Sequence, residues 1–245
     1  MDDFPYLYRN SLAEAGRLGE TERWWDSFHN NAACARYIEA AIRGSFDEAA
    51  EQLKPGCAES VLAVWGFRRV NMVLANTLRD VPSHLRHLYS GENLDWGGKA
   101  WLPPDTAYRR YYVVQSGATL TDSFVTQARE AYQALGLFGP EHCEEDSRKQ
   151  DFTGKVLVLR PDVMKESCWS PQNCLWKADT GFGCSPTAMG RAVYATCLGD
   201  GEQARWDRAD FTGVLKDEFL PDWAREKLEE LQAQKQSGPA MGGMA

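Results

Sequence analysis

Residues suited to a binding or catalytic loop are concentrated between Gly181 and Arg191. Closely spaced glycines mark a backbone that bends sharply or approaches another group closely. Amides, hydroxyl groups and a guanidinium together suit a phosphate or carboxylate. The candidate ligand-binding residues are Gly181, Gly183, Ser185, Thr187 and Arg191. The stretch matches no glycine-rich phosphate-binding motif, so we favour a structural turn in which Arg191 pairs with Asp179 or Asp207.

Cys184 is a weak candidate for a catalytic nucleophile in this stretch. A reactive cysteine needs a nearby base, a cation or a helix N-terminus to lower the pKa of its thiol. Arg191 could stabilise a thiolate, but the four histidines, at positions 29, 84, 87 and 142, precede the C-terminal region. A small buried thiol in a tight turn is therefore the interpretation we favour.

Metal and cofactor sites are not expected. Cys168, Cys174, Cys184 and Cys197 are separated by five, nine and twelve residues. Structural zinc sites usually take closely spaced pairs of ligands. His84 and His87 could share a helical face, but no carboxylate motif of the metalloprotease kind accompanies them.

The C-terminal part of the chain, residues 151–232, is predicted to be a small α+β unit. The apolar run 156–159 suggests a buried strand. Asp200-Gly201 lies between two strand-like runs, which predicts a β-hairpin, and a closing helix is expected from Pro221 onward. Trp169 and Trp176 are expected in an irregular segment, where they could anchor a protein partner. The repeated Asp-Phe-Thr-Gly at 151–154 and 210–213 is attributed to chance.

Residues 1–105 are predicted to form an all-helical unit. Apolar residues recur at helical spacing over 20–43, 57–65 and 70–78, and Ser45–Glu48 has the pattern of a capping box for a short helix to Leu53. Residues 106–150 are expected to form a connection: a strand over 108–115, a helix over 121–135 and a charged linker over 141–151. The tail, 233–245, is expected to be disordered. The fold class is therefore α+β.

Composition excludes several broad classes of function. A net charge of −8, spread over both halves, argues against a nucleic-acid-binding module. No apolar run approaches the roughly 20 residues that span a bilayer. The acidic N-terminus lacks the apolar segment of a signal peptide, and an odd number of cysteines, seven, favours reduced thiols. These features predict a cytoplasmic protein.

The chain also resembles an uncharacterised family, a domain of unknown function carried on conjugative elements and prophages of anaerobic Gram-positive gut bacteria. In the N-terminal part the matching stretches are Tyr8–Ser11, Asn31–Cys34, Ile38–Ile42, Trp65–Val70 and Val73–Thr77. In the C-terminal part they are Gly181–Pro186, Gly190–Val193, Arg205-Trp206 and Asp210–Gly213. The resemblance implies residence on a mobile element and brings no catalytic residues with it.

Two hypotheses about function follow. The leading one is a non-enzymatic accessory protein of a mobile genetic element that binds a protein partner, with antagonism of host defence as one such role. The alternative is an enzyme or a small-ligand or nucleotide-binding protein that uses the Gly181–Arg191 loop. The oligomeric state is left open.

Overall fold

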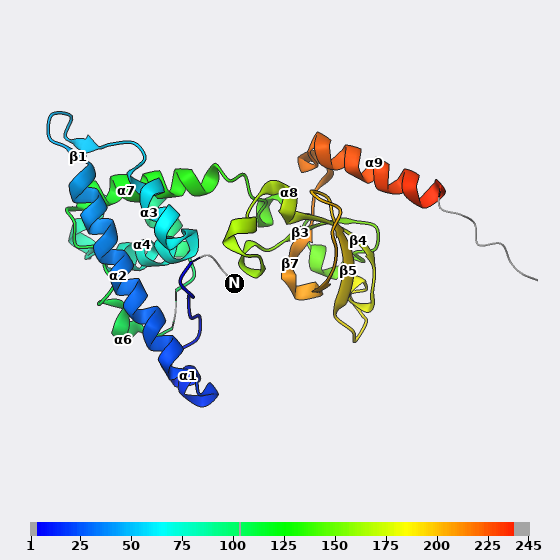
Figure 1. Ribbon diagram of the computed structural model, residues 1–245, viewed down its shortest axis with the longest axis horizontal. Helices are drawn as coiled ribbons and strands as arrows, with labels where there is room; N and C mark the ends of the chain where they lie inside the picture. Colours follow the sequence, from blue (N-terminus) through cyan, green and yellow to red (C-terminus); the bar gives the residue numbers. More distant parts are fainter. Residues whose placement is uncertain (1–3, 103, 238–245) are drawn as a thin grey trace, which may run out of the picture. The chain divides into compact units, whose positions relative to one another are not determined.

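The computed structural model describes residues 4–102 and 104–237, and it has an α+β fold (Figure 1). The chain divides into two compact units, Met1–Ala134 and Leu135–Ala245, called here the N-terminal and C-terminal units. The expected fold class is confirmed. Each unit has a hydrophobic core of its own.

The N-terminal unit is built mainly from helices, which Figure 1 draws in blue to green. Its helices are α1 (Leu12–Leu18), α2 (Thr21–Ser45), α3 (Cys57–Trp65), α4 (Phe67–Asp80), α5 (Gly91–Lys99), α6 (Thr106–Arg109) and α7 (Ala118–Gln133). The Ser11 side chain accepts a hydrogen bond from the Glu14 amide and so begins α1, while Gly19 ends this helix in the left-handed conformation. Gly66 separates α3 from α4.

Helix α4 lies at the centre of this unit, and most of its residues are buried. It carries one charged side chain into the core, Arg69, which is 1% exposed. The Arg69 guanidinium donates to the carbonyl oxygens of Ser27 at 3.0 Å, Pro5 at 3.1 Å and Tyr6 at 2.6 Å. A buried charge is tolerated only when it is hydrogen-bonded. These bonds fasten the N-terminal segment to α2 and α4.

Two local predictions for this unit are wrong. Residues 45–53 form a short antiparallel hairpin, β1 (Phe46–Asp47) and β2 (Gln52–Leu53), in place of a helix. The Asp47 carboxylate accepts from the amides of Ala49 and Ala50, and Glu51 has a positive φ of 53°. A side chain that bonds to the following amides competes with helix formation, so the turn wins here.

The strand expected over 108–115 is also absent. Helix α6 ends at Arg109, and the segment after it pairs with side chains. The Asn76 side-chain amide donates to the carbonyl of Arg109 at 2.8 Å, and the Val114 amide donates to the Thr77 hydroxyl at 3.0 Å. These partners come from α4, which satisfies the extended backbone without a neighbouring strand.

The C-terminal unit contains a five-stranded antiparallel sheet in the order β6-β5-β4-β3-β7. The expected strand, hairpin and closing helix are confirmed as β3, the β5–β6 pair and α9. The elements are β3 (Val156–Leu159), α8 (Pro171–Cys174), β4 (Leu175–Thr180), β5 (Ala192–Cys197), β6 (Gln203–Asp207), β7 (Phe211–Val214) and α9 (Asp222–Ser237).

The two faces of this sheet are covered differently because side chains alternate along each strand. Val158 and Leu175 pack on the side of α9, together with Trp223 and Ala224. The opposite face carries Leu157, Leu159, Trp176, Ala178, Val193, Ala195 and Cys197. This second face is called the groove face below.

The expected linker over 141–151 is instead part of the C-terminal unit. Cys143 forms a bridge with Leu215, and the amide of Glu144 donates to the Val214 carbonyl at 2.9 Å. These pairings use backbone groups, so the polar side chains of the segment give no indication of them in the sequence. At the other end of the unit, α9 continues to Ser237, so the start of the expected disordered tail is helical. Residues 238–245 lie outside the described residues.

Candidate functional site

The Gly181–Arg191 loop connects β4 to β5, and two of its three glycines, Gly181 and Gly183, are explained by packing against the backbone at the start of β5. Gly181 has a φ of 121°, a region that side chains rarely adopt. A Cβ atom there would overlap the carbonyl oxygen of Ala192, and one on Gly183 would overlap that of Arg191. The loop backbone therefore lies directly on the first residues of β5. These contacts account for both glycines without a ligand.

An arginine that the sequence analysis did not single out holds this loop. The Arg208 guanidinium donates to the carbonyl oxygens of Gly183 and Cys184, each at 2.7 Å, and to that of Gln150 at 2.7 Å. It also lies over the ring of Phe152, 3.7 Å from the centroid. The planar fork of arginine suits several carbonyls at once. The residues on either side of Arg208 in the sequence gave no signal for such a role.

The repeated Asp-Phe-Thr-Gly segments meet near this arginine, but they have different structures. The rings of Phe152 and Phe211 are 6.3 Å apart and nearly perpendicular, and both are buried. The first segment, 151–154, is a turn, whereas Phe211–Val214 is strand β7. The repetition thus contributes two core rings and no shared local motif.

Cys184 is buried at 2% exposure, and its carbonyl also accepts from the Phe152 amide at 2.9 Å. Burial raises the pKa of its thiol, and a nearby Asp151 acts in the same direction. A raised pKa keeps the thiol protonated, and only the thiolate is a nucleophile. The surroundings of Cys184 therefore suit a structural thiol.

The remaining polar residues of the loop are engaged locally. The hydroxyls of Ser185 and Thr187 lie 3.2 Å apart. The Arg191 side chain is 73% exposed, and its Nε lies 3.7 Å from a carboxylate oxygen of Asp207. This contact is one of the two acidic pairings expected for a structural turn. Ligand binding by these residues stays a prediction.

Thiol alkylation tests the assignment of Cys184. Of the seven cysteines, Cys168 is exposed and the others are buried. With iodoacetamide at pH 7.5 we expect Cys168 to be modified first, and Cys184 at least about 100-fold more slowly, because burial and a raised pKa both disfavour its thiolate. Because the pKa of Cys184 is raised, its labelling rate should go on rising with pH beyond roughly pH 8.5, where the rate of a free thiol levels off. Peptide mass spectrometry gives the rate at each site.

Unfolding in urea provides the control, since all seven cysteines should then react at similar rates. Labelling of Cys184 as fast as that of Cys168 in the folded protein would restore the nucleophile hypothesis.

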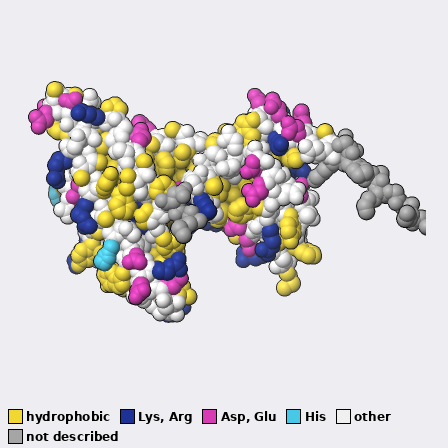
Figure 2. Space-filling model, viewed as in Figure 1, with side chains coloured by type: hydrophobic (Ala, Val, Ile, Leu, Met, Phe, Trp, Pro, Cys, Tyr) yellow, Lys and Arg dark blue, Asp and Glu magenta, His cyan; other side chains and the backbone are white. Residues whose placement is uncertain are grey.

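Two large apolar side chains of the loop face the solvent. Phe182 is 78% exposed and Met189 is 100% exposed. A Cβ atom on Gly190 would contact the Phe182 side chain at 2.7 Å, so this glycine lets the ring approach the backbone. In Figure 2, hydrophobic side chains project from the end of the C-terminal unit where Figure 1 draws the yellow loop before β5. The sequence analysis did not select either residue.

The two tryptophans proposed as partner anchors lie elsewhere in the unit. Trp176 was expected in an irregular segment, but it is part of β4 and only 5% exposed. Its ring packs at 5.2 Å against that of Trp206, at an angle of 80°. Trp169 does lie outside regular structure; it is half-buried, and its indole donates to the Pro161 carbonyl at 2.8 Å. A partner role for either residue stays a prediction.

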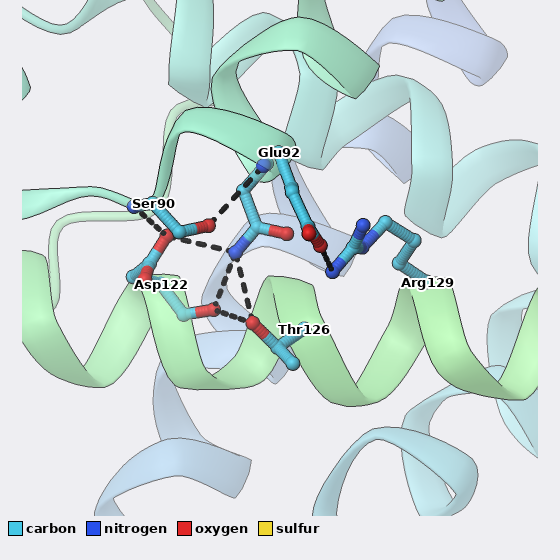
Figure 3. Close-up of polar contacts among 6 residues, drawn as sticks. Ser90, Glu92, Asp122, Thr126 and Arg129 are labelled. Atoms are coloured by element: carbon cyan, nitrogen blue, oxygen red, sulfur yellow. Dashed lines mark hydrogen bonds and ion pairs between the residues drawn. The ribbon is translucent and has the colours of Figure 1, made fainter.

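The N-terminal unit contains a polar cluster between α5 and α7 (Figure 3). The Asp122 carboxylate accepts from the Ser90 amide at 3.0 Å and from the side chain of the fully buried Asn93 at 2.8 Å. Arg129 and Glu92 form an ion pair at 2.6 Å beside it. The Ser90 side chain caps α5 by accepting from the Asn93 amide, and the Asp122 carboxylate ties both residues to α7. We therefore interpret the cluster as a link between helices.

Comparison with known proteins assigns the N-terminal unit. The family described as "Protein of unknown function (DUF3849)" matches residues 7–133, just over half of the 245 residues. The chain belongs to the DUF3849 family. The expected membership of an uncharacterised family is thus confirmed. The DUF3849 match ends one residue before the end of the N-terminal unit, and the loop and the sheet lie outside it.

No curated protein and no solved structure matches this DUF3849 chain. In the part of the chain that the structure describes, no three His, Cys, Asp or Glu side chains could together hold a metal ion. Among the described helices, none has the length and apolar character needed to cross a membrane.

Proposed function

We propose that this protein is a non-enzymatic binding module that recognises a protein partner through its β4–β5 loop. The observation that carries the proposal is the exposure of Phe182 and Met189 on a loop whose backbone is held at its base. Connecting loops usually place polar residues at their tips. An apolar pair held in water is a feature of interaction sites.

The fixed backbone favours binding because little conformational entropy is lost on association. Packing of Gly181 and Gly183 on β5 and the three bonds from Arg208 hold the base of the loop. Aromatic residues and methionine are enriched in the cores of interfaces. The partner surface that fits this loop is an apolar pocket that accepts a phenylalanine ring and a methionine side chain.

The class of partner follows from the family resemblance of the sequence. In the setting of a mobile element, the partner is a host protein or a protein encoded by the element, and binding would serve to antagonise a host defence. This part of the proposal rests on the resemblance to an uncharacterised family.

A quantitative pull-down tests the role of the loop. We expect immobilised wild-type protein to retain one or more specific proteins from a host-cell extract. The double variant Phe182→Ser, Met189→Ser should retain them at least tenfold less, because the anchors are lost while the core is untouched. Leu18→Ser is the matched control, since Leu18 is also exposed, at 55%, but lies on α1. Equal retention by all three proteins would contradict the proposal.

A further inference from the structure

A second candidate site lies on the groove face of the sheet, away from the β4–β5 loop in sequence. A groove of about 360 Å³ crosses this face. Its floor includes Leu159, Trp176 and Trp206, and Val163 and Met164 line it from the segment after β3. Grooves of this size with aromatic walls and a few polar groups are typical ligand sites.

Two cations lie at the margin of the groove. Lys165 and Arg205 both line it and are exposed. Within the described residues, neither side chain forms an ion pair or a hydrogen bond. Two acidic residues, Asp200 and Glu202, lie at the same margin, and the Asp200 carboxylate accepts from the Glu202 amide at 2.8 Å. These charges balance within the groove, and the positive charge that a strand bound along β6 would meet is that of Arg205, whose side chain also reaches the opposite face of the sheet.

The groove is bordered by β6, which is an edge strand of the sheet. The Cys197 amide donates to the Glu202 carbonyl, and the Arg208 amide donates to the Arg191 carbonyl. In an antiparallel ladder, successive residues direct their backbone groups alternately toward and away from the neighbouring strand. Glu202 and Arg208 both direct theirs toward β5, so the even-numbered residues of β6 between them do the same. The N–H and C=O groups of Gln203 and Arg205 consequently point away from β5. Within the described residues, no hydrogen bond from these outward groups is made.

We propose that β6 and the groove together bind an extended peptide segment of a partner protein, in which a large apolar residue is flanked by an acidic one. The peptide would add as a further strand, about 4.8 Å from β6. A residue beside Ala204 and Trp206 then places its side chain on the groove face, over the aromatic floor. The next residue of the peptide places its side chain on the other face of the sheet, beside Arg205. In the sheet register Arg205 pairs with Tyr194.

A second copy of this chain fits the groove less well than a different sequence does. If two β6 strands paired, the side chains added to the groove face would be those of Ala204 and Trp206 from the other copy. Trp206 already packs against Trp176 in its own unit. The groove would then stay empty, so an apolar residue from a different segment is the better occupant.

The test uses fluorescent ten-residue peptides of alternating sequence. The central residue is Phe or Ala, and its two neighbours are both Glu or both Lys. Fluorescence polarisation with the full chain should show that the Phe peptide with Glu neighbours binds at least tenfold more tightly than either the Ala peptide or the Lys peptide. Equal affinity for all the peptides would overturn the proposal.

Variants of β6 test separately the backbone pairing with the peptide and the preference for an acidic residue. Gln203→Pro deletes one outward amide, and proline is tolerated at an edge strand. It should weaken binding at least tenfold, whereas Gln203→Ala should change it less than twofold. Arg205→Glu should reverse the preference toward the Lys peptide. Unchanged binding by both Gln203→Pro and Arg205→Glu would also overturn the proposal.

Two further measurements separate peptide binding at β6 from self-association and from binding at the loop. Native mass spectrometry that shows a dimer lost in Gln203→Pro would assign the edge to a second copy and reject the peptide. Peptide binding should be unchanged in the Phe182→Ser, Met189→Ser variant, because the proposal does not use the loop. Failure at the loop and failure at β6 are thus observed independently.

Discussion

Replacement of Gly181 by alanine should lower the free energy of unfolding of the C-terminal unit by about 2–4 kcal/mol. Two effects add at this position. The backbone has a φ of 121°, where a side chain is strained, and the new Cβ would overlap the backbone carbonyl oxygen of Ala192. A backbone atom of a central strand cannot move aside as a flexible side chain could. Hydrogen exchange of the β4 and β5 amides gives the local loss of stability.

Gly201 supplies a control for a positive φ without steric overlap. It also has a positive φ, 80°, but nothing lies within 4 Å of a Cβ built on it. Gly201→Ala should therefore cost only the left-handed conformation, about 1–2 kcal/mol. The difference between the two variants reports the close approach of the loop to β5 together with the more strained backbone of Gly181, whose φ of 121° and ψ of 151° lie outside the left-handed helical region. Equal losses would show that the loop does not pack on the strand as described.

The second large effect is expected from Arg208. Arg208→Ala should destabilise the C-terminal unit by about 3 kcal/mol, because three carbonyl oxygens lose a charged donor and the Phe152 ring loses its cover. Arg208→Lys keeps the charge but lacks the fork, so it should recover only part of the loss. Urea unfolding measures the stability. The rate of Cys184 alkylation should rise in both variants as the loop loosens.

Arg191 is the natural comparison because it belongs to the same loop. Its side chain is mostly exposed, and its ion pair with Asp207 is long. Exposed pairs contribute little, so Arg191→Ala should change the stability by about 0.5 kcal/mol or less. A larger cost for Arg191→Ala than for Arg208→Ala would mean that Arg191, and not Arg208, holds the loop.

Much of the backbone was predictable from local patterns. The helical spacing of apolar residues located α2 and α7, and the Asp-Gly between two strand-like runs located the β5–β6 hairpin. Gly181 and Gly183 correctly marked a sharp loop close to other backbone. In each case the signal and its structural cause lie within a few residues of one another, so they are visible in a single stretch of sequence.

The predictions failed where a distant group decided the outcome. The segment 108–115 has residue types typical of a strand, but side chains of α4 bind its backbone. The polar segment 141–151 pairs with backbone groups around β7, some 70 residues later. Trp176 was expected at the surface, yet it lies in β4 and is covered by Trp206. Local propensity is a weak guide when tertiary contacts supply the partners.

The sequence by itself determined that this protein is an α+β chain with a helical first part, a glycine-dependent loop near residue 185 and a resemblance to an uncharacterised family. Only the tertiary structure decided which arginine holds that loop, which apolar side chains it exposes, and that β6 borders an aromatic groove. Hydrophobic spacing and turn residues act over one or two turns of chain. The partners of Arg208 and the walls of the groove come from segments tens of residues apart, and only folding brings them together.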